Sequence, residues 1–306
     1  MALLAAGLLA GCAGPDENEI PGADRQPILL NAGIQQMTEG TRATTFDNAT
    51  ALQTEGSFTC VAYNANTTTE YISPTTVNWN SSTSQWEFNG GANHYYWPLP
   101  STPGGTYPAL DFFAYMPATK PDYITSGPTI TNTSGTHTIA FGCDMSETVG
   151  KEFVFAMALD QNQTGTNTTT QPTAGQVDLS FKHPFAKVTF QKTDGATYTI
   201  NSVSVSGSFK ATGTCTYDGS TCMWTSLDGS VTPSFSFNTP VIAIPYDYGS
   251  FTVSANVSWT DWSNVSKTLS SSATFNLQAG HSYTYTISVT KDYALKVDTE
   301  KFTEQW

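Results

Sequence analysis

The segment Phe251-Thr-Val-Ser-Ala-Asn-Val-Ser-Trp259 decides the fold class of this chain. Its apolar side chains recur at every second residue, which is the period of a strand with one buried face. A second run with the same period contains Tyr283, Tyr285, Ile287 and Val289. Both runs are bounded by Gly, Asn, Asp or Ser, which favour turns. The two segments therefore predict half-buried β-strands.

The overall composition points in the same direction. Charged residues and aromatic residues each make up 12% of the chain, and Thr, Ser, Asn and Gly are abundant, a balance that favours pleated surfaces and turns over surface helices. Continuous apolar runs at residues 110–115, 153–159 and 241–244 predict strands that are buried on both faces. No segment carries a convincing 3.6-residue apolar stripe over three turns. We expect an all-β protein.

One polar segment divides the chain. Residues 160–176 contain no large apolar side chain, so they cannot contribute to a core. We therefore expect a linker or a long exposed loop over residues 161–176. Similar strand patterns lie on both sides of it. The sequence predicts two β-sandwich domains, over residues 27–160 and 177–306.

The N-terminus carries an export signal. Leu9-Ala-Gly-Cys12 closes a short apolar run and forms a lipobox, in which a small-residue cleavage site precedes an acylated cysteine. An acidic segment follows, with Asp16, Glu17 and Glu19. We expect a signal peptide over residues 1–11, a lipid on Cys12 and an acidic tether over residues 12–26. Since no Lys or Arg precedes Cys12, we expect the basic part of the signal peptide upstream of the assigned start.

Charge and hydropathy exclude several classes of partner. The formal net charge is -13 and no window is rich in Lys or Arg, which argues against binding of nucleic acid. Neither the eleven residues before Cys12 nor the run at 153–159 is long enough to span a bilayer. Membrane attachment is therefore expected through the lipid anchor on Cys12 alone.

The sequence offers little support for an enzyme. No histidine belongs to a His-x-His or His-x-x-x-His pattern, and no Gly-x-Ser-x-Gly or phosphate-binding glycine loop is present. The histidines are His94, His137, His183 and His281. Carboxylates occur singly, so no glycosidase pair can be named. We expect no metal, no cofactor and no catalytic residue, although a site assembled in space stays open at this point.

Two cysteines are candidates for a disulfide. Cys215 and Cys222 flank a turn signal at Asp218-Gly219, and a two-residue turn there would place the cysteines directly opposite each other in a hairpin. Their Cα atoms would then lie roughly 5.5 Å apart, which permits a bridge. The alternative is a metal or redox site. Cys60 and Cys143 are either a second bridge or free thiols.

An aromatic cluster has two interpretations. Its members are Trp79, Trp86, His94, Tyr95, Tyr96 and Trp97. If exposed and coplanar, these rings would form a platform for stacking sugars. If buried, they fill the space between two sheets, as large aromatic side chains do in small sandwiches.

The arginines identify a site of proteolytic processing. The chain has only two, Arg25 and Arg42, and its lysines all lie from Lys120 onward. An Arg-specific protease would therefore trim the N-terminus without cutting the rest of the chain, at either arginine. The alternative is that chance placed both arginines there.

Between the two arginines lies a segment with the period of a strand. Its alternating apolar residues are Ile28, Leu30, Ala32 and Ile34. Cleavage at the bond between Arg42 and Ala43 would free this strand and leave a groove with unpaired backbone groups on both sides. An open groove of this kind accepts a strand from another molecule.

The C-terminal segment is a candidate for that incoming strand. Leu295 and Val297 share one parity, whereas Phe302 and Trp306 share the other, so one straight strand cannot bury both pairs. We expect two short strands or one strand with a bulge. Residues 294–306 are either a donor strand for the next subunit or the final strand of the second sandwich.

Four segments resemble the fimbrillin family, the lipoprotein-derived pilins of Gram-negative anaerobes of the gut and mouth. They are Thr41-Arg-Ala-Thr44, Trp97-Pro98 with Leu110-Asp-Phe-Phe-Ala-Tyr-Met-Pro117, Val177-Asp-Leu-Ser-Phe-Lys-His-Pro-Phe-Ala-Lys-Val-Thr-Phe190, and Ala279-Gly-His-Ser-Tyr-Thr-Tyr-Thr-Ile-Ser-Val289. The resemblance implies two transthyretin-like β-sandwich domains in tandem, lipoprotein export to the outer membrane, and Arg-directed cleavage at Arg42-Ala43. It also implies polymerisation by strand exchange into an adhesive fimbria.

The partners implied by this resemblance are other pilin subunits, of stalk, tip or anchor type, an Arg-specific protease, and a host glycan or protein receptor. The leading hypothesis is therefore a structural pilin at the cell surface. The rival is a surface-anchored, glycan-binding lipoprotein that does not polymerise. The two differ in whether the rings from Trp86 to Trp97 are exposed and coplanar. A third hypothesis, an extracellular hydrolase, requires a cleft with paired carboxylates.

Overall fold

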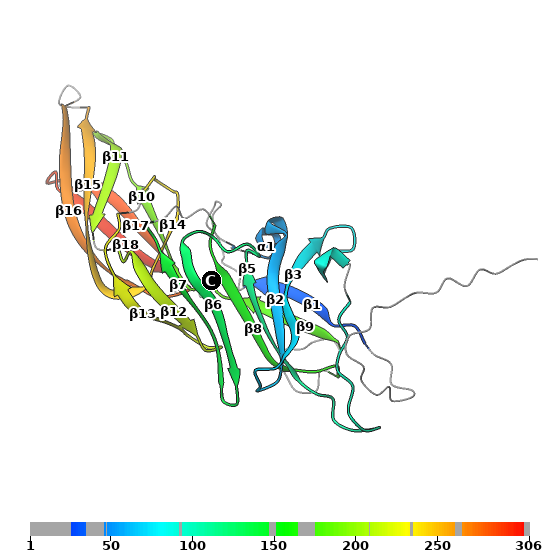
Figure 1. Cartoon of the computed structure of the whole chain (residues 1–306). Helices are drawn as coiled ribbons and strands as arrows, with labels where there is room; N and C mark the ends of the chain where they lie inside the picture. Colours follow the sequence, from blue (N-terminus) through cyan, green and yellow to red (C-terminus); the bar gives the residue numbers. More distant parts are fainter. Residues whose placement is uncertain are drawn as a thin grey trace, which may run out of the picture.

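A computed structural model shows the protein to be built almost entirely of β-strands (Figure 1). It describes residues 26–34, 46, 48–91, 94–146, 151–164, 175–207, 209–232, 235–260 and 265–302. In these ranges the helical elements are α1 (Ala49–Glu55) and a 3-10 turn, η1 (Asn89–Gly91). The predicted all-β class is confirmed. No helix in the described ranges is long and apolar enough to cross a membrane.

The first sheet has seven strands and curls until its two ends meet. Its order is β8 (Val154–Gln161), β5 (Leu110–Met116), β2 (Ser57–Asn64), β3 (Glu70–Asn80), β4 (Gln85–Phe88), β1 (Leu29–Ile34) and β9 (Gln176–Phe181). Phe155 of β8 exchanges two backbone hydrogen bonds of 2.8 and 3.3 Å with Lys182, the residue after β9. The inner face therefore encloses one hydrophobic core, which α1 helps to cover.

A second sheet packs against the outer face of the first. Its order is β13 (Cys222–Asp228), β12 (Thr212–Tyr217), β7 (Thr136–Asp144) and β6 (Ile124–Thr133). Strand β5 lies between the two cores: Phe112 belongs to the inner core and Phe113 to the core between the sheets. This double burial explains the continuous apolar runs at residues 110–115 and 153–159.

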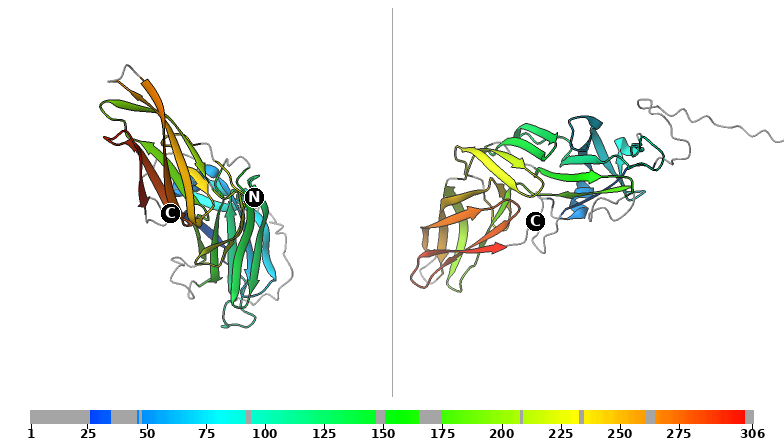
Figure 2. Two further views of the ribbon diagram at one scale, coloured as in Figure 1. Left: turned by 90° about the vertical axis from the view of Figure 1, so that its left-hand side faces the viewer. Right: turned by 90° about the horizontal axis from the view of Figure 1, so that it is seen from below.

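The remaining strands form a second sandwich. One sheet contains β14 (Val241–Ala243), β10 (Ala186–Lys192), β17 (Ser282–Val289) and β18 (Leu295–Phe302), and the other contains β11 (Tyr198–Gly207), β15 (Tyr246–Trp259) and β16 (Val265–Leu277). Figure 2 shows this sandwich at one end of an elongated molecule. The alternating residues of 251–259 and 283–289 all lie in its core, so both predicted strands are confirmed.

The sheets do not divide where the polar segment predicted a boundary. Strand β9, at the start of the predicted second domain, joins the first sheet beside β1, and β12 pairs with β7. The polar segment is also shorter than expected, because Gln161 ends β8 and Gln176 begins β9. Residues 165–174 lie outside the described ranges. Composition marks an exposed segment, but long-range packing decides which strands pair across it.

The hairpin β12–β13 corrects the predicted cysteine geometry. Its loop has four residues, Asp218–Thr221, instead of two, which places Cys222 opposite Tyr217 and Cys215 opposite Trp224. The two cysteines are therefore diagonal neighbours, and the prediction that they face each other directly is wrong. Both are free thiols in the structure, as are Cys60 and Cys143.

Asp218 explains the longer loop. Its Oδ1 atom accepts hydrogen bonds from the backbone N–H of Thr221 (2.8 Å) and of Ser220 (2.9 Å). These bonds favour the ionised carboxylate and lower the pKa of Asp218 to about 2. The side chain thus closes the turn that fixes the register of the hairpin.

We predict that this contribution disappears in acid. Because the folded pKa lies below the unfolded value of about 3.9, the ionised Asp218 stabilises the fold above about pH 4 and stops doing so as the pH falls towards 2. Asp218→Ala should lower the urea midpoint at neutral pH, and the difference from the wild type should shrink in acid. Fluorescence-monitored unfolding over a pH series tests this. A difference that is constant with pH would contradict it.

Candidate assembly site at the N-terminal strand

Strand β1 is a buried strand with alternating exposure. The buried side chains of β1 and of the residue before it are those of Ile28 (4% exposed), Leu30 (7%), Ala32 (6%) and Ile34 (7%). All four belong to the inner core, whereas Leu29 is 45% exposed. The strand predicted from the alternation at residues 28–34 is therefore present, with the predicted face buried.

Both edges of β1 are hydrogen-bonded. On one side it runs parallel to β9, in register from Leu29 opposite Gln176 to Ile34 opposite Phe181. On the other side it is antiparallel to β4 and to the segment after it: Leu30 pairs with Trp86, and the N–H of Ile28 donates to the Tyr95 carbonyl at 2.8 Å. Loss of β1 would therefore leave the facing edge of β9 unpaired along its whole length and that of β4 unpaired at Trp86.

A side-chain contact fixes the register of β1 on β9. Asn31 points to the outer face and donates from Nδ2 to Oδ1 of Asp178 at 2.9 Å. The two residues are directly opposite each other in the parallel ladder. A shift of one residue would break this bond and turn the buried side chains outward.

Aromatic side chains share the inner core with the buried face of β1. Phe58 packs against Trp86 and Phe181, with ring centroids 5.0 and 5.5 Å apart. Because β4 and β9 would become the two walls of the gap, removing β1 would leave an apolar groove between two unpaired strand edges. Cys12, Arg25, Arg42 and Ala43 lie outside the described residues, so the lipidation and cleavage predictions stay predictions.

The C-terminal strand is docked in its own sandwich. Strand β18 pairs with β17 without a register shift, from Leu295 opposite Val289 to Phe302 opposite Ser282. Over Leu295–Phe302 the chain is thus one strand without the expected bulge, and residues 303–306 lie outside the described residues.

The face of β18 that packs inward is that of Leu295 and Val297. Leu295 is 7% exposed and Val297 packs against the same core. The side chain of Phe302 and all of Trp306 lie outside the described residues. In this structure residues 295–302 are thus the final strand of the second sandwich, which was one of the two alternatives. The strand lies at the edge of its sheet, with β17 as its hydrogen-bonded neighbour.

The aromatic cluster is part of the core. Trp86 is 6% exposed and Trp97 is 1% exposed, and the indole Nε1 of Trp97 donates to the Gly175 carbonyl at 3.2 Å. Trp79 is tilted by 59° from Trp86. Trp79 and Tyr95 are half-buried against the same core, whereas His94 and Tyr96 (41%) are exposed. The tryptophans therefore form no exposed, coplanar platform. The core-packing interpretation is the one that the structure supports.

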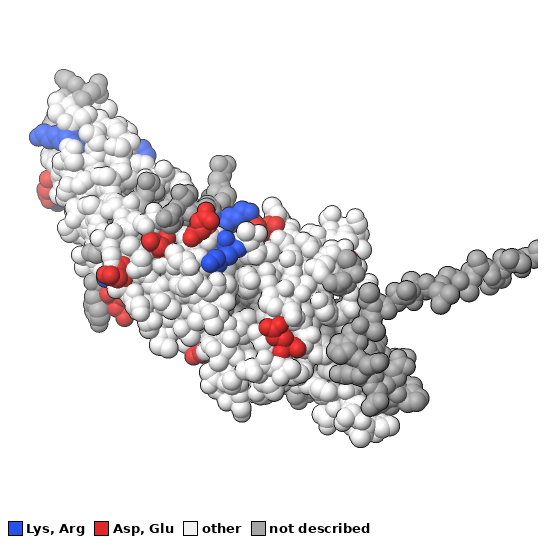
Figure 3. Space-filling model, in the orientation of Figure 1, with Lys and Arg blue, Asp and Glu red and all other residues white. Residues whose placement is uncertain are grey.

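The described residues contain no cluster of potential metal ligands, and two of their cysteines are deeply buried thiols. No group of three potential His, Cys, Asp or Glu ligands exists among them. Burial raises the pKa of the Cys60 thiol, and that of the Cys143 thiol, to about 12, so both stay protonated at neutral pH. On the face shown in Figure 3, charged side chains are scattered rather than gathered into a basic patch.

One buried pair escaped the sequence analysis. Glu152 Oε1 lies 2.8 Å from His183 Nδ1, and both side chains are fully buried. The contact joins the residues before β8 to the connection between β9 and β10. Because the partners are 31 positions apart, no local spacing could have revealed them.

The comparisons with known proteins agree with this architecture. A model of the family described as Fimbrillin-like matches residues 41–306, so this protein belongs to the fimbrillin-like family. The resemblance found in the sequence is confirmed. No curated protein matches the chain.

Solved structures share the fold. A fimbrial protein from Bacteroides vulgatus is 17% identical, with 92% of this chain and 100% of that chain covered and a TM-score of 0.54. Candidate cell adhesion proteins from Bacteroides ovatus (18% identity, 93% and 99% covered, TM-score 0.52) and Bacteroides uniformis (14% identity, 90% and 97% covered, TM-score 0.52) are also similar.

Two neighbouring leucines test how much β1 contributes to the fold. Leu30→Ala removes a buried side chain from the inner core and should lower the free energy of unfolding by about 2–5 kcal/mol. Leu29→Ala, on the exposed face of the same strand, is the matched control and should change it by less than about 0.5 kcal/mol. Denaturant unfolding of the untrimmed protein measures both. Equal effects would show that β1 does not cover the core in solution.

Proposed function

We propose that this protein is a structural fimbrial subunit at the cell surface, exported as a lipoprotein and polymerised by strand exchange after its N-terminal strand is cut away. The observation that carries the proposal is β1 itself. It fills a slot between β4 and β9, buries alternate side chains, pairs with β9 along its whole length and pairs with β4 at Leu30. The rest of the folded chain follows β1, so a single cut after this strand would separate it and let another strand take its place.

The position of the arginines supports cleavage after Arg42. A cut after Arg25 precedes β1 and would leave the strand covalently attached, whereas a cut after Arg42 lies beyond Ile34 and would detach it. This difference favours Arg42-Ala43 as the processed bond.

The replacing strand in this proposal is residues 294–306 of another subunit. Strand β18 occupies an edge, with a hydrogen-bonded ladder to β17, whereas a strand in the groove between β4 and β9 gains ladders on both sides. Release exposes Leu295 and Val297, and insertion buries them again. Each apolar side chain buried in the groove contributes about 1.5–3 kcal/mol.

The order of side-chain sizes suggests a register. In β1 the buried face presents Ile28, Leu30 and then the small Ala32. The inward face of β18 presents Leu295, Val297 and then Thr299, which is exposed in its own sheet. A large, large, small order in both strands supports placing Thr299 where Ala32 lies. The opposite parity, which includes Phe302 and Trp306, would put the acidic and basic residues of β18 into the core.

In this proposal the lipid brings the precursor to the cell surface. Acylation at Cys12 would hold the precursor at the outer membrane, and the acidic tether over residues 12–26 would keep the folded part accessible to an Arg-specific protease. Cleavage at Arg42-Ala43 would remove the lipid and β1 together. Other subunits, of stalk, tip or anchor type, are the partners of the opened groove.

The cleavage step predicts a defined mature end. Subunits isolated from fimbriae should begin at Ala43, as N-terminal sequencing would show. Arg42→Ala should leave lipidated monomers on a denaturant-free gel after protease treatment. Arg25→Ala is the matched control and should polymerise normally. Normal polymers from Arg42→Ala would contradict this processing site.

The donor step predicts a size limit at Thr299. Thr299→Phe should fold, because the side chain is exposed in its own sheet, but should polymerise poorly, because overpacking in the Ala32 position costs about 1–3 kcal/mol. Thr299→Ala should polymerise, and so should the outward-facing control Lys296→Ala. Assembly of trimmed subunits is followed on denaturant-free gels. Deleting residues 294–306 should abolish it, and polymers from that deletion would exclude this donor.

A further inference from the structure

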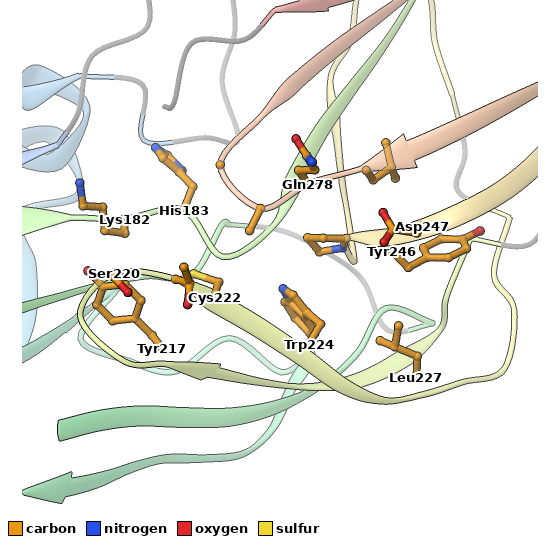
Figure 4. Close-up of a pocket in the computed structure, with 15 residues that line it drawn as sticks. Lys182, His183, Tyr217, Ser220, Cys222, Trp224, Leu227, Tyr246, Asp247 and Gln278 are labelled. Atoms are coloured by element: carbon orange, nitrogen blue, oxygen red, sulfur yellow. The ribbon is translucent and has the colours of Figure 1, made fainter. Parts of the chain in front are cut away.

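A cavity of about 520 Å³ lies where the first sandwich meets the second (Figure 4). It is bounded by the hairpin β12–β13, the residues after β9, the start of β15 and the turn between β16 and β17. None of its lining residues belongs to β1, β4 or β18. The cavity is therefore separate from the assembly site, and its volume lies in the range of small-molecule sites.

Trp224 gives the cavity a fixed aromatic wall. Its indole Nε1 donates to the Pro184 carbonyl at 2.8 Å, and its ring packs against Phe185 and Phe141 at centroid distances of 5.3 and 5.9 Å. These contacts hold the ring in one orientation before any ligand arrives, which lowers the entropic cost of binding. Leu227 and Leu277 extend the apolar surface.

Polar groups of three different kinds surround this apolar wall. Lys182 supplies an ammonium group, Asp247 a carboxylate and Gln278 an amide. Figure 4 shows Lys182 to the left of Trp224, Gln278 above it and Asp247 to its right. The set offers donors, acceptors and a group that is both.

We propose that this cavity binds a saccharide, one or two sugar rings of a glycan. A sugar ring has an apolar face that stacks on an indole and a rim of hydroxyls that both donate and accept hydrogen bonds. An aliphatic ligand would cover the Asp247 carboxylate without offering it a hydrogen-bond donor, which is costly. A phosphate would meet the negative charge of Asp247 with a single lysine opposite, in a chain of net charge -13.

The experiment uses the purified full chain and a fixed panel of galactose, N-acetylglucosamine, lactose, cellobiose and N-acetylneuraminic acid. Saturation-transfer NMR identifies the binders, and titration gives their dissociation constants. Asp247→Ala and Gln278→Ala alter exposed side chains and should weaken binding about tenfold without changing the unfolding midpoint. Trp224→Phe should also weaken it, whereas Trp79→Phe, half-buried outside the cavity, should not.

Three outcomes would overturn the proposal: no member of the panel binds, binding is insensitive to Asp247→Ala and Gln278→Ala, or a synthetic peptide of residues 294–306 binds here and displaces the sugar. The last outcome would make the cavity a peptide site. Loss of polymerisation by Arg42→Ala should leave sugar binding unchanged, so this proposal and the proposed assembly can fail independently.

Discussion

The first sheet depends on β1, because the strand supplies partners to two others at once. Strand β9 is bonded to β1 along its whole length and to β8 by the bridge between Phe155 and Lys182 at its end. Unpaired backbone groups in a buried sheet are costly, so the slot between β4 and β9 has to be filled by some strand. A strand in this slot must supply backbone hydrogen bonds and apolar side chains of the right volume. A strand of the same chain or of another molecule can meet that requirement.

This requirement connects the fold to the proposed assembly. In the precursor, the covalent link makes β1 the effective occupant, since a tethered strand binds without losing translational freedom. Cutting the link removes that advantage. In the proposed assembly, β18, held at the edge of its sheet by one ladder to β17, would give up that ladder for pairing with both β4 and β9. The number of ladders on each side would then set the direction of exchange.

The alternation of apolar and polar residues predicted individual strands and their buried faces, because both depend on neighbouring residues in the sequence. The alternation at 28–34, 251–259 and 283–289 identified strands and their buried faces, because each side chain reports its own environment. The pairing of β9 with β1 and of β12 with β7 was not predictable, since partners far apart leave no periodic signal. The short helix α1, over 49–55, spans too few turns to show a stripe.

The candidate sites show the same division. The groove could be foreseen because one strand defines it, whereas the cavity beside Trp224 is assembled from four separate segments. Its existence follows from the hairpin β12–β13, which leaves the strands of the second sandwich and pairs with β7 of the first. The hairpin lies between β11 and β14 in the chain but pairs with the first sandwich, so the shape of the cavity depends on strands other than β1 and β4. In the proposed assembly, one strand at the N-terminal site would be replaced while the joint between the sandwiches that carries Trp224 stays intact.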